Sequence, residues 1–524
     1  MKKTMLLVLM INWFQLSINA QDVKIEWGKP KEANSKTIPI KFLGISDGFI
    51  YLLTSEEVRF KNMVIEKYDE KTNTLISATE LQFKLNLPRV YLLNGQLVTI
   101  DCEATKTKSS FYVTPITPTG ELSPDKKLLT EFDLNPDENS YDYYNWVSSE
   151  DTKQILLYHQ HVKEKKLEYA IVDEKLNVTK GSFKYESESN LILQLNYFGH
   201  KDFVFLNERD HKPQNVIFNN SAIYMLFAEL KPKDEQIKTV DISNLDAERI
   251  VNYNYSLLIY NKDGKSVKPI KLDFKKENHL LSTYLRLDEN NNIIITGTYQ
   301  EKDNNYNNTK GFYCVRIDTK TNTIISKLEY DYPKEFATNF ISEKQYDKKY
   351  GVPFFTLRDF VTKEDGGILL VTENYIKREM GSDNAWVYFP KEIVIISINK
   401  NGQEEWIKVI PKNQLGDMRD NGLHVSFVTA YSKNNLYLIY NDYPENMNIK
   451  EESKLKSEYK KLKGTVTAMV TMNCKDGSWE KKILFDYKSD AFYLTPQQYY
   501  KLNKNEIIIH GQNDKTEVLG RLKY

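Results

Sequence analysis

The chain has 524 residues, and its 72 Lys and Arg residues are balanced by 72 Asp and Glu residues. This balance leaves no electrostatic footprint for nucleic acid or an anionic membrane, and we expect neither as a partner. An apolar share of 40% with a charged share of 27% excludes a disordered chain. Tyr (35 copies) and Phe (24 copies) are frequent, and because aromatic residues favour strands, all-β is the first expectation.

The N-terminus carries a targeting pattern. Met1-Lys2-Lys3 is a short basic region, Thr4 to Leu16 is mainly apolar, and a small residue follows at Ala20. This order predicts a signal peptide over residues 1–20 and export to the periplasm or the extracellular space, with a buried N-terminal strand as the alternative. The longest later apolar stretch, residues 222–230, is too short to span a membrane, so we expect no membrane span.

The cysteine count bounds how the exported chain is stabilised. Cys102, Cys314 and Cys474 are odd in number and far apart, so the sequence predicts no disulfide framework. Residues 21–524 are long enough to bury a large core, and we expect them to form a single domain. Two domains that divide near residues 276–280 are the alternative.

One repeating unit runs along the chain. It contains two apolar strands joined by a tight polar turn, then a variable gap, and two more strands joined by a turn with Gly or Asn. Small antiparallel sheets at such a period are typical of a β-propeller, and the count of units predicts eight blades. Seven blades are the alternative, because the unit over residues 191–274 is long and irregular. The expected second strands begin near Phe49, Leu97, Ile155, Phe203, Ile293, Ile368, Leu436 and Ile507.

The two ends of the chain predict how the propeller closes. The last unit supplies only three strands, over residues 498–502, 506–510 and 517–524, whereas residues 23–28 form a spare strand before the first full unit. An N-terminal strand that completes the last blade would remove two exposed sheet edges at once. We therefore expect the eighth blade to be closed by the N-terminal strand.

A stretch in the sixth unit carries a family resemblance. Glu364-Asp-Gly-Gly-Ile-Leu-Leu-Val-Thr372 followed by Ile393 to Trp406 resembles a repeat of secreted bacterial β-propeller proteins, with an Asp-Gly-Gly turn before one strand and an Asn-x-x-Gly turn before a Trp. The end of the signal peptide and the Lys/Asn/Ile-rich composition look like an exported protein of the Bacteroidetes group. The resemblance implies a propeller fold and export, and it implies no activity because propellers have many functions.

The lengths of the connections distinguish the two faces of the expected propeller. Turns between first and second strands and between third and fourth strands share one face, and they are short. The opposite face receives the long insertions near residues 208–254, 373–392 and 441–464, of which residues 447–463 predict a short surface helix or, alternatively, a solvated loop. Because long loops in a compact domain are usually functional, we expect binding on this face.

Six residues near these insertions are candidate binding residues. Exposed aromatic rings would stack on sugars or hold a partner side chain, and the alternative is ordinary packing against the blades. The charged loop that contains Arg209 and His211 would bind a ligand, and the alternative is that its charged side chains only form ion pairs with one another. The candidates are Tyr375, Trp386, Tyr388 and Tyr443 for the aromatic group, and Arg209 and His211 for the charged loop.

Three other motifs receive structural interpretations. Gly44-Ile-Ser-Asp-Gly48 matches G-x-S-x-G but joins two strands, so it predicts a turn rather than a nucleophile. His159 and His161 would be half of a metal site without a third ligand, or a solvent-facing pair. Asp288 to Asn292 is rich in oxygen ligands but lacks the order of a calcium loop. We predict no catalytic residue, no metal and no cofactor.

The function predicted from these observations is an exported, non-catalytic binding or scaffolding propeller at the cell envelope. The expected partner is an envelope protein or a glycan on the long-loop face, and we expect a monomer. The alternatives are a sugar-binding lectin and an enzyme that acts on a polysaccharide or peptide in the propeller funnel. A carboxylate pair with a raised pKa in the funnel would favour the enzyme.

Overall fold

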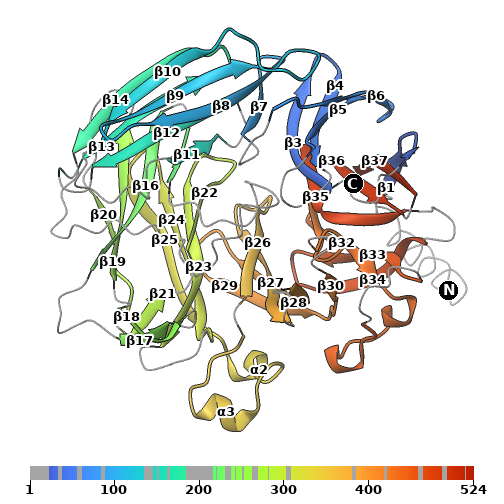
Figure 1. Cartoon of the computed structure of the whole chain (residues 1–524). Helices are drawn as coiled ribbons and strands as arrows, with labels where there is room; N and C mark the ends of the chain where they lie inside the picture. Colours follow the sequence, from blue (N-terminus) through green and yellow to red (C-terminus); the bar gives the residue numbers. More distant parts are fainter. Residues whose placement is uncertain are drawn as a thin grey trace, which may run out of the picture.

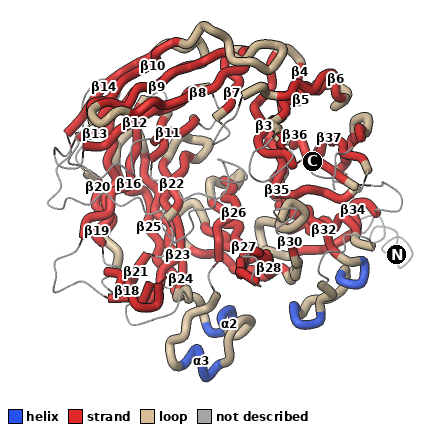
Figure 2. The backbone as a smooth tube through the Cα atoms, in the orientation of Figure 1, coloured by secondary structure: helices blue, strands red, loops and turns tan. Residues whose placement is uncertain are grey.

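The computed structural model shows a ring of small antiparallel sheets (Figure 1), and strands make up nearly all of its regular structure (Figure 2). The residues that the structure describes are 23–32, 38–55, 62–83, 89–134, 145–149, 153–161, 164, 166–184, 216–219, 221–230, 238–241, 244–250, 253–261, 269–275, 277–280, 283–301, 308–353, 355–380, 385–417, 422–457, 464–486, 492–513 and 515–524.

Eight sheets follow one another around the ring in chain order, so the predicted eight-bladed β-propeller is confirmed. The first blade consists of β3 (Ile38–Ser46), β4 (Phe49–Ser55), β5 (Val64–Asp69) and β6 (Leu75–Glu80), and the second of β7 (Val90–Leu93), β8 (Gln96–Ala104), β9 (Lys108–Pro115) and β10 (Lys127–Asp133). The third blade consists of β11 (Asn145–Ser148), β12 (Gln154–His161), β13 (Lys166–Asp173) and β14 (Val178–Lys184), and the fourth of β15 (Val216–Phe218), β16 (Ala222–Leu230), β19 (Tyr253–Asn261) and β20 (Ile270–Leu272).

The next four blades complete the ring. The fifth blade consists of β21 (Asn278–Leu280), β22 (Tyr284–Leu287), β23 (Ile293–Glu301), β24 (Gly311–Asp318) and β25 (Thr323–Asp331), and the sixth of β26 (Phe355–Thr362), β27 (Ile368–Met380), β28 (Ala385–Ile398), β29 (Glu404–Ile410) and the short β30 (Gly416–Asp417). The seventh blade consists of β31 (Val428–Ser432), β32 (Asn435–Asp442), β33 (Val466–Asn473) and β34 (Trp479–Asp486). The eighth consists of β35 (Tyr493–Asn503), β36 (Glu506–Gln512) and β37 (Thr516–Lys523) with β1 (Lys24–Trp27) and β2 (Lys31–Glu32) from the N-terminus.

The first strand of each blade is the innermost one. First strands of neighbouring blades contact each other, as β3 does with β7 and β35, and β31 does with β35. In the fifth blade β21 and β22 both pair with β23, and the short β30 of the sixth blade pairs with β28; the other strands of each blade pair antiparallel one after another and lie progressively farther from the axis. Residues on the first strands therefore surround the centre of the ring.

The N-terminal strand closes the ring as the sequence predicts. β1 pairs antiparallel with β37, with Ile25 opposite Leu522 and Trp27 opposite Gly520. The Trp27 ring lies against Gly511 and Gly520, where a Cβ atom would come within 3.0 Å of it. The absence of side chains at these two glycines gives the indole a flat surface, so the last blade is matched to its N-terminal strand.

A buried ion group joins the closing blade to the first blade. Lys31 of β2 pairs with Glu66 of β5 and with Glu517 of β37, the latter at 2.8 Å. His510 Nε2 lies 3.3 Å from the Glu517 carboxylate, and the Tyr68 hydroxyl donates to Glu66 at 2.6 Å. We call these five residues the latch cluster.

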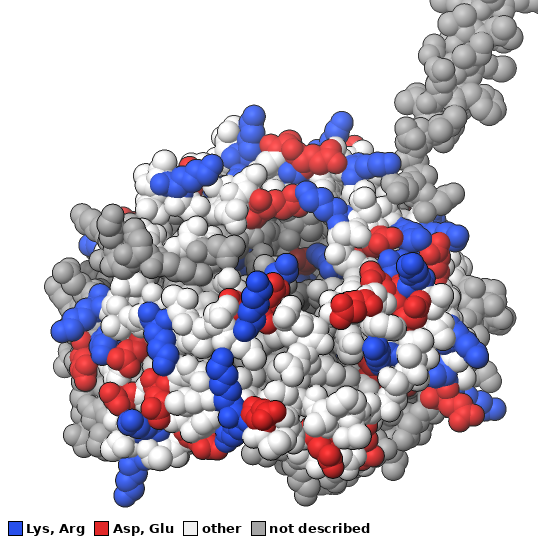
Figure 3. All heavy atoms as spheres, turned by 90° about the horizontal axis from the view of Figure 1, so that it is seen from above, with Lys and Arg blue, Asp and Glu red and all other residues white. Residues whose placement is uncertain are grey.

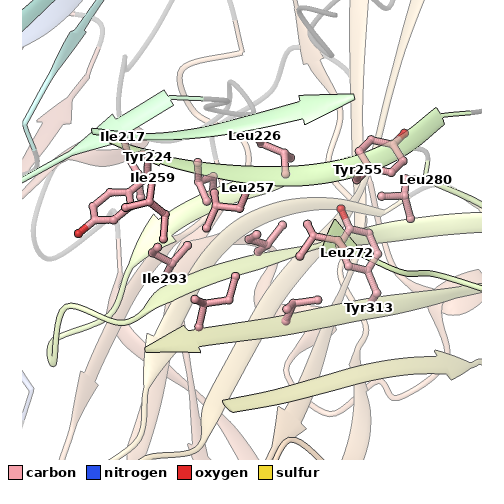
Figure 4. Packing of buried hydrophobic residues seen from close by; sticks show 14 of the residues in the cluster. Ile217, Tyr224, Leu226, Tyr255, Leu257, Ile259, Leu272, Leu280, Ile293 and Tyr313 are labelled. Atoms are coloured by element: carbon pink, nitrogen blue, oxygen red, sulfur yellow. The ribbon is translucent and has the colours of Figure 1, made fainter. Parts of the chain in front are cut away.

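The hydrophobic core lies between adjacent blades. Figure 4 shows the largest part of it, where strands of the fourth blade pack on those of the fifth, with Leu257 and Ile259 facing Ile293 and Tyr313. The Tyr313 hydroxyl donates to Thr283 Oγ1 at 2.7 Å, so its polar atom is satisfied inside the core. Buried tyrosines of this kind explain part of the high tyrosine content.

Tight turns between third and fourth strands repeat one local chemistry. Asp69 Oδ1 accepts from Thr72 N at 2.8 Å, and Asn73 then takes a positive φ of 52°. Asp318 and Asn322 repeat this arrangement in the fifth blade. Asp and Asn are favoured here because their side chains bond to the turn backbone and tolerate the left-handed region.

The fourth blade differs from the sequence prediction. Its second strand is β16, whereas the prediction placed that strand near Phe203, which lies outside the described residues. The range 208–254 contains β15, β16 and a separate hairpin of β17 (Lys238–Asp241) and β18 (Asn244–Ile250). The apolar run at 222–230 was therefore the better signal for a central strand than the shorter run at 203.

Among the described residues, two short α-helices and two 3-10 turns lie in the long connections of the propeller. α2 (Lys334–Ala337) and α3 (Glu343–Asp347) lie between the fifth and sixth blades and project together from the ring (Figure 1). In the described part of residues 447–463 the structure has the 3-10 turn Glu452–Lys454 rather than the predicted helix, and the 3-10 turn Pro444–Asn446 precedes this range. Asn446 is fully buried, and its side chain bonds to both backbone groups of Lys456, which holds the segment as a loop.

Within the described residues, no helix is long and apolar enough to cross a membrane.

Candidate binding site at the inner strands of blades six to eight

The longest hairpin of the propeller supports the candidate site. β27 has 13 residues and β28 has 14, so the pair extends beyond the other strands of the sixth blade. The range 373–392, predicted as an insertion, holds the extended half of this hairpin. Its pairing shifts between Glu373 and Tyr375 near Pro390, because proline has no N–H to donate to a strand.

A buried carboxylate sits where this shift occurs. Arg358 Nε donates to Glu373 Oε2 at 2.6 Å, and Lys412 Nζ lies 2.7 Å from Glu373 Oε1. The Ser426 hydroxyl donates to Glu373 Oε2 at 2.9 Å, and Lys412 also donates to Gln414 Oε1 at 3.0 Å. We call these five residues the Glu373 cluster, and it joins the sixth blade to the link that leads into the seventh.

Burial and the neighbouring charges shift the pKa values of all three charged groups in this cluster. Burial acts to raise the pKa of Glu373, but the charges of Arg358 and Lys412 outweigh it, so this pKa lies below its usual value. Burial acts to lower the pKa of Arg358, yet the Glu373 carboxylate holds it above its ordinary value. Burial does lower the pKa of Lys412, although Glu373 opposes the shift.

Two β-bulges bring polar side chains to one place beside the cluster. In β26 the pairing steps from Leu357 to Asp359, so Arg358 is the extra residue. In β35 it steps from Leu494 to Tyr499, so residues 495–498, with Pro496 among them, oppose a single residue of β36. Bulges re-aim side chains and are frequent beside functional sites.

A recess lies between these inner strands. Its enclosed space is about 10 Å³, which is room for roughly one water molecule. Its walls combine the guanidinium of Arg358 with hydroxyl and amide groups and with two aromatic rings. The lining residues are Arg358, Ser426, Phe427, Thr429, Pro496, Gln497 and Tyr499.

A second ion group lies next to the recess. Asp359 is buried, and its carboxylate lies 2.7 Å from Lys501 Nζ and 3.6 Å from Arg286. These residues come from the first strands of the sixth, eighth and fifth blades, so the group bridges strands that surround the axis. Figure 3 shows the molecule hollowed near its middle, with basic and acidic side chains around the hollow.

Of the predicted aromatic residues, the structure brings Tyr375 and Tyr388 together. Their ring centroids are 6.1 Å apart, and the Arg358 guanidinium lies 4.3 Å from the Tyr375 centroid. Tyr375 is half-buried, but Tyr388 is 3% exposed and Tyr443 is 7% exposed. The expectation of exposed rings is therefore wrong for the latter two: the link through Gly422 lies against Tyr388, and Tyr443 is buried at the start of the link after β32. Trp386 lies in β28, and its side chain is outside the described residues.

The predicted charged and metal candidates have different outcomes. Arg209 and His211 lie outside the described residues, so their binding role stays a prediction. His159 and His161 are buried rather than solvent-facing, with ring centroids 4.6 Å apart. Within the described part of the chain, no group of three or more His, Cys, Asp or Glu side chains is arranged to hold a metal ion.

The sequence prediction missed Arg358, Glu373, Lys412 and Gln497. A signal for Glu373 was present, because a lone acidic residue directly follows the apolar run Ile368 to Thr372 of a central strand. A charge in such a strand is costly to bury unless it is paired, so it marks a polar network. The partners were not visible, since they come from two bulges and a link.

Comparisons with known proteins give only distant structural similarities. No family model matches the chain, and no curated protein matches it. The quinohemoprotein alcohol dehydrogenase from Comamonas testosteroni is 10% identical over 97% of this chain and 78% of its own, with a TM-score of 0.39. The propeller domain of the trilobed protease from Pyrococcus furiosus is 12% identical over 90% and 97%, with a TM-score of 0.31.

A polysaccharide lyase, an ulvan lyase, is 10% identical over 87% of this chain and 96% of its own, with a TM-score of 0.36. At such identities and TM-scores, these similarities carry no inference about a ligand or a reaction.

Proposed function

We propose that this chain is an exported, non-catalytic propeller that binds a ligand or scaffolds a partner at the cell envelope, through the recess and the Glu373 cluster. The observation that carries the proposal is the state of the carboxylates. Glu373 is held between two cations, and Asp359 lies between Lys501 and Arg286. Both are committed to ion pairs rather than available to transfer protons.

The pKa directions support the same interpretation. In the described residues, every carboxyl group with a shifted pKa has it lowered. A general acid at neutral pH needs the opposite shift. A recess lined by guanidinium, hydroxyl and amide groups is suited to the recognition of a polar ligand.

The test is a glycan and peptide array probed with the wild-type protein and with Gln497→Leu, which removes one polar lining group. We expect spots that bind the wild type and lose signal with the variant, while chromatography of the recovered ligand shows no cleavage. Cleaved products would support the polysaccharide- or peptide-acting enzyme instead. An array without wild-type binding, together with no envelope protein in a pull-down, would contradict the proposal.

A further inference from the structure

The charge of the innermost strands differs from the charge of the whole chain. The chain has equal numbers of basic and acidic residues, 72 each. Within the described first strands, from β3 to β35, the basic residues are Lys41, Arg286, Arg358 and Lys501, and the acidic residue is Asp359. The lining of the ring is therefore basic although the molecule as a whole is neutral.

The ion groups beside the recess have the same imbalance. Arg358 and Lys412 share the Glu373 carboxylate, and Arg286 and Lys501 share the Asp359 carboxylate. Among the described residues these two groups thus join four basic side chains to two carboxylates. Burial of excess charge is unfavourable, so an anion that enters beside these groups would be stabilised by their field.

The recess offers an anion the donors that it needs. Arg358 is 7% exposed and lines the recess with a planar guanidinium, which matches the two oxygens of a carboxylate. The hydroxyl of Thr429, the amide of Gln497 and the ring of Tyr499 complete the walls. Lys501 follows Tyr499 by two residues on β35, so both side chains lie on one face of that strand.

We propose that the recess binds a carboxylate group, as carried by a small acidic sugar or an acidic amino acid, with Arg358 as its main contact and Lys501 as a long-range attractor. This inference rests on the proposed function and narrows its ligand to an anion. It requires the recess to widen from the size of one water molecule, and a movement of Gln497 would break the hydrogen bond that its amide donates to Gly422 O at 2.8 Å.

The experiment is calorimetric titration of the full chain with sodium glucuronate and, separately, with sodium N-acetylglutamate. The uncharged partners, which are the methyl ester of glucuronic acid and N-acetylglutamine amide with both carboxyl groups amidated, serve as controls, and the two acids distinguish a sugar source from an amino-acid source. We expect at least one acid to bind and its neutral partner not to bind. Added salt should weaken the binding, because the attraction is electrostatic.

Two matched variants locate the site. Lys501→Gln should raise the dissociation constant about fivefold, since it removes one nearby charge. Lys504→Gln should leave it unchanged, because that side chain is 81% exposed in the turn after β35 and pairs with Glu289 at 2.8 Å. Arg358→Lys should abolish measurable binding while circular dichroism shows an intact fold.

Three results would overturn the inference: no binding of either acid, equal binding of the neutral partners, or equal loss in both lysine variants. These outcomes are distinguishable from a failure of the proposed function. If the array finds ligands that are all neutral and that need Gln497, the binding function stands and the anion inference fails. If the chain cleaves its ligand, the binding function itself fails.

Discussion

The Glu373 cluster and the latch cluster are both buried ion groups, but they differ in charge and in surroundings. The Glu373 cluster joins two cations to one carboxylate beside a recess. The latch cluster surrounds Lys31 with two carboxylates, and the His510 ring lies against one of them. The first group has more cations than carboxylates and lies next to an opening, whereas the second has two carboxylates around one lysine.

This difference separates a structural role from a binding role. Buried ion pairs contribute little net stability compared with apolar side chains, but they disfavour alternative arrangements. The latch cluster connects β2, β5 and β37, so it fixes how the N-terminal segment aligns with the first and last blades. The Glu373 cluster instead fixes a bulge and a link, so it shapes the wall of the recess.

The largest expected effect comes from removal of the central carboxylate. Glu373→Ala leaves Arg358 and Lys412 buried without their common partner, and we expect the free energy of unfolding to fall by about 3–5 kcal/mol. Urea denaturation measures this change. The triple variant Arg358→Met, Glu373→Leu, Lys412→Met removes all three charges together and should recover most of the loss. A single variant that unfolds like the wild type would show that the cluster is not desolvated.

The latch cluster should respond less strongly. Lys31→Met leaves Glu66 and Glu517 buried without their common cation, but His510 still faces one of them, so we expect a loss of about 3 kcal/mol. The same variant should expose residues 24–32 to limited proteolysis, since β1 and β2 would detach first. Lys24→Met is the matched control, because that side chain is 70% exposed and should change stability by less than about 0.5 kcal/mol.

The fold could be predicted from the sequence because propeller blades repeat local signals. Each blade contains turns with Asp or Asn and apolar strands, and these can be recognised from the local sequence alone. Together with the spare N-terminal strand, they predict eight blades in a closed ring. In the fourth blade the prediction chose the apolar run near Phe203 for the second strand, whereas β16 holds that position, because the turn signals are irregularly spaced over residues 191–274.

The sequence places binding on the face with the long connections, and that placement stays a prediction. Tyr375 and Tyr388 are indeed near the recess, but the sequence does not show that Tyr388 is covered by the link through Gly422. Arg358 and Gln497 reach the recess through bulges, and a bulge shifts the side-chain alternation by which strand faces are read. The contacts of Arg358 and Gln497 depend on three blades that meet at the axis. A local sequence pattern therefore cannot predict these contacts.

A third buried group, His159, sharpens the comparison because it is titratable and neutral. Burial, followed by the neighbouring His161, lowers its pKa from 6.5 to about 4, although Glu168 opposes the shift. His161 Nε2 lies 3.2 Å from the Glu168 carboxylate, which also pairs with Lys166. The lysine therefore already provides a cation for this carboxylate, and His159 is not needed as one. His159 therefore contributes as an uncharged ring packed near Phe132.

The smallest predicted effect is the pH dependence that His159 causes. The unfolded ring takes up a proton near pH 6.5, but the folded ring stays neutral down to about pH 4. The unfolded state then binds more protons between these values, so stability falls as the pH falls, by up to about 3 kcal/mol for this group. His159→Phe should remove that part of the slope in urea denaturation between pH 7 and pH 4. Because carboxylates titrate in the same range, the difference between wild type and variant is the informative quantity, and parallel curves would show that the folded ring is solvated.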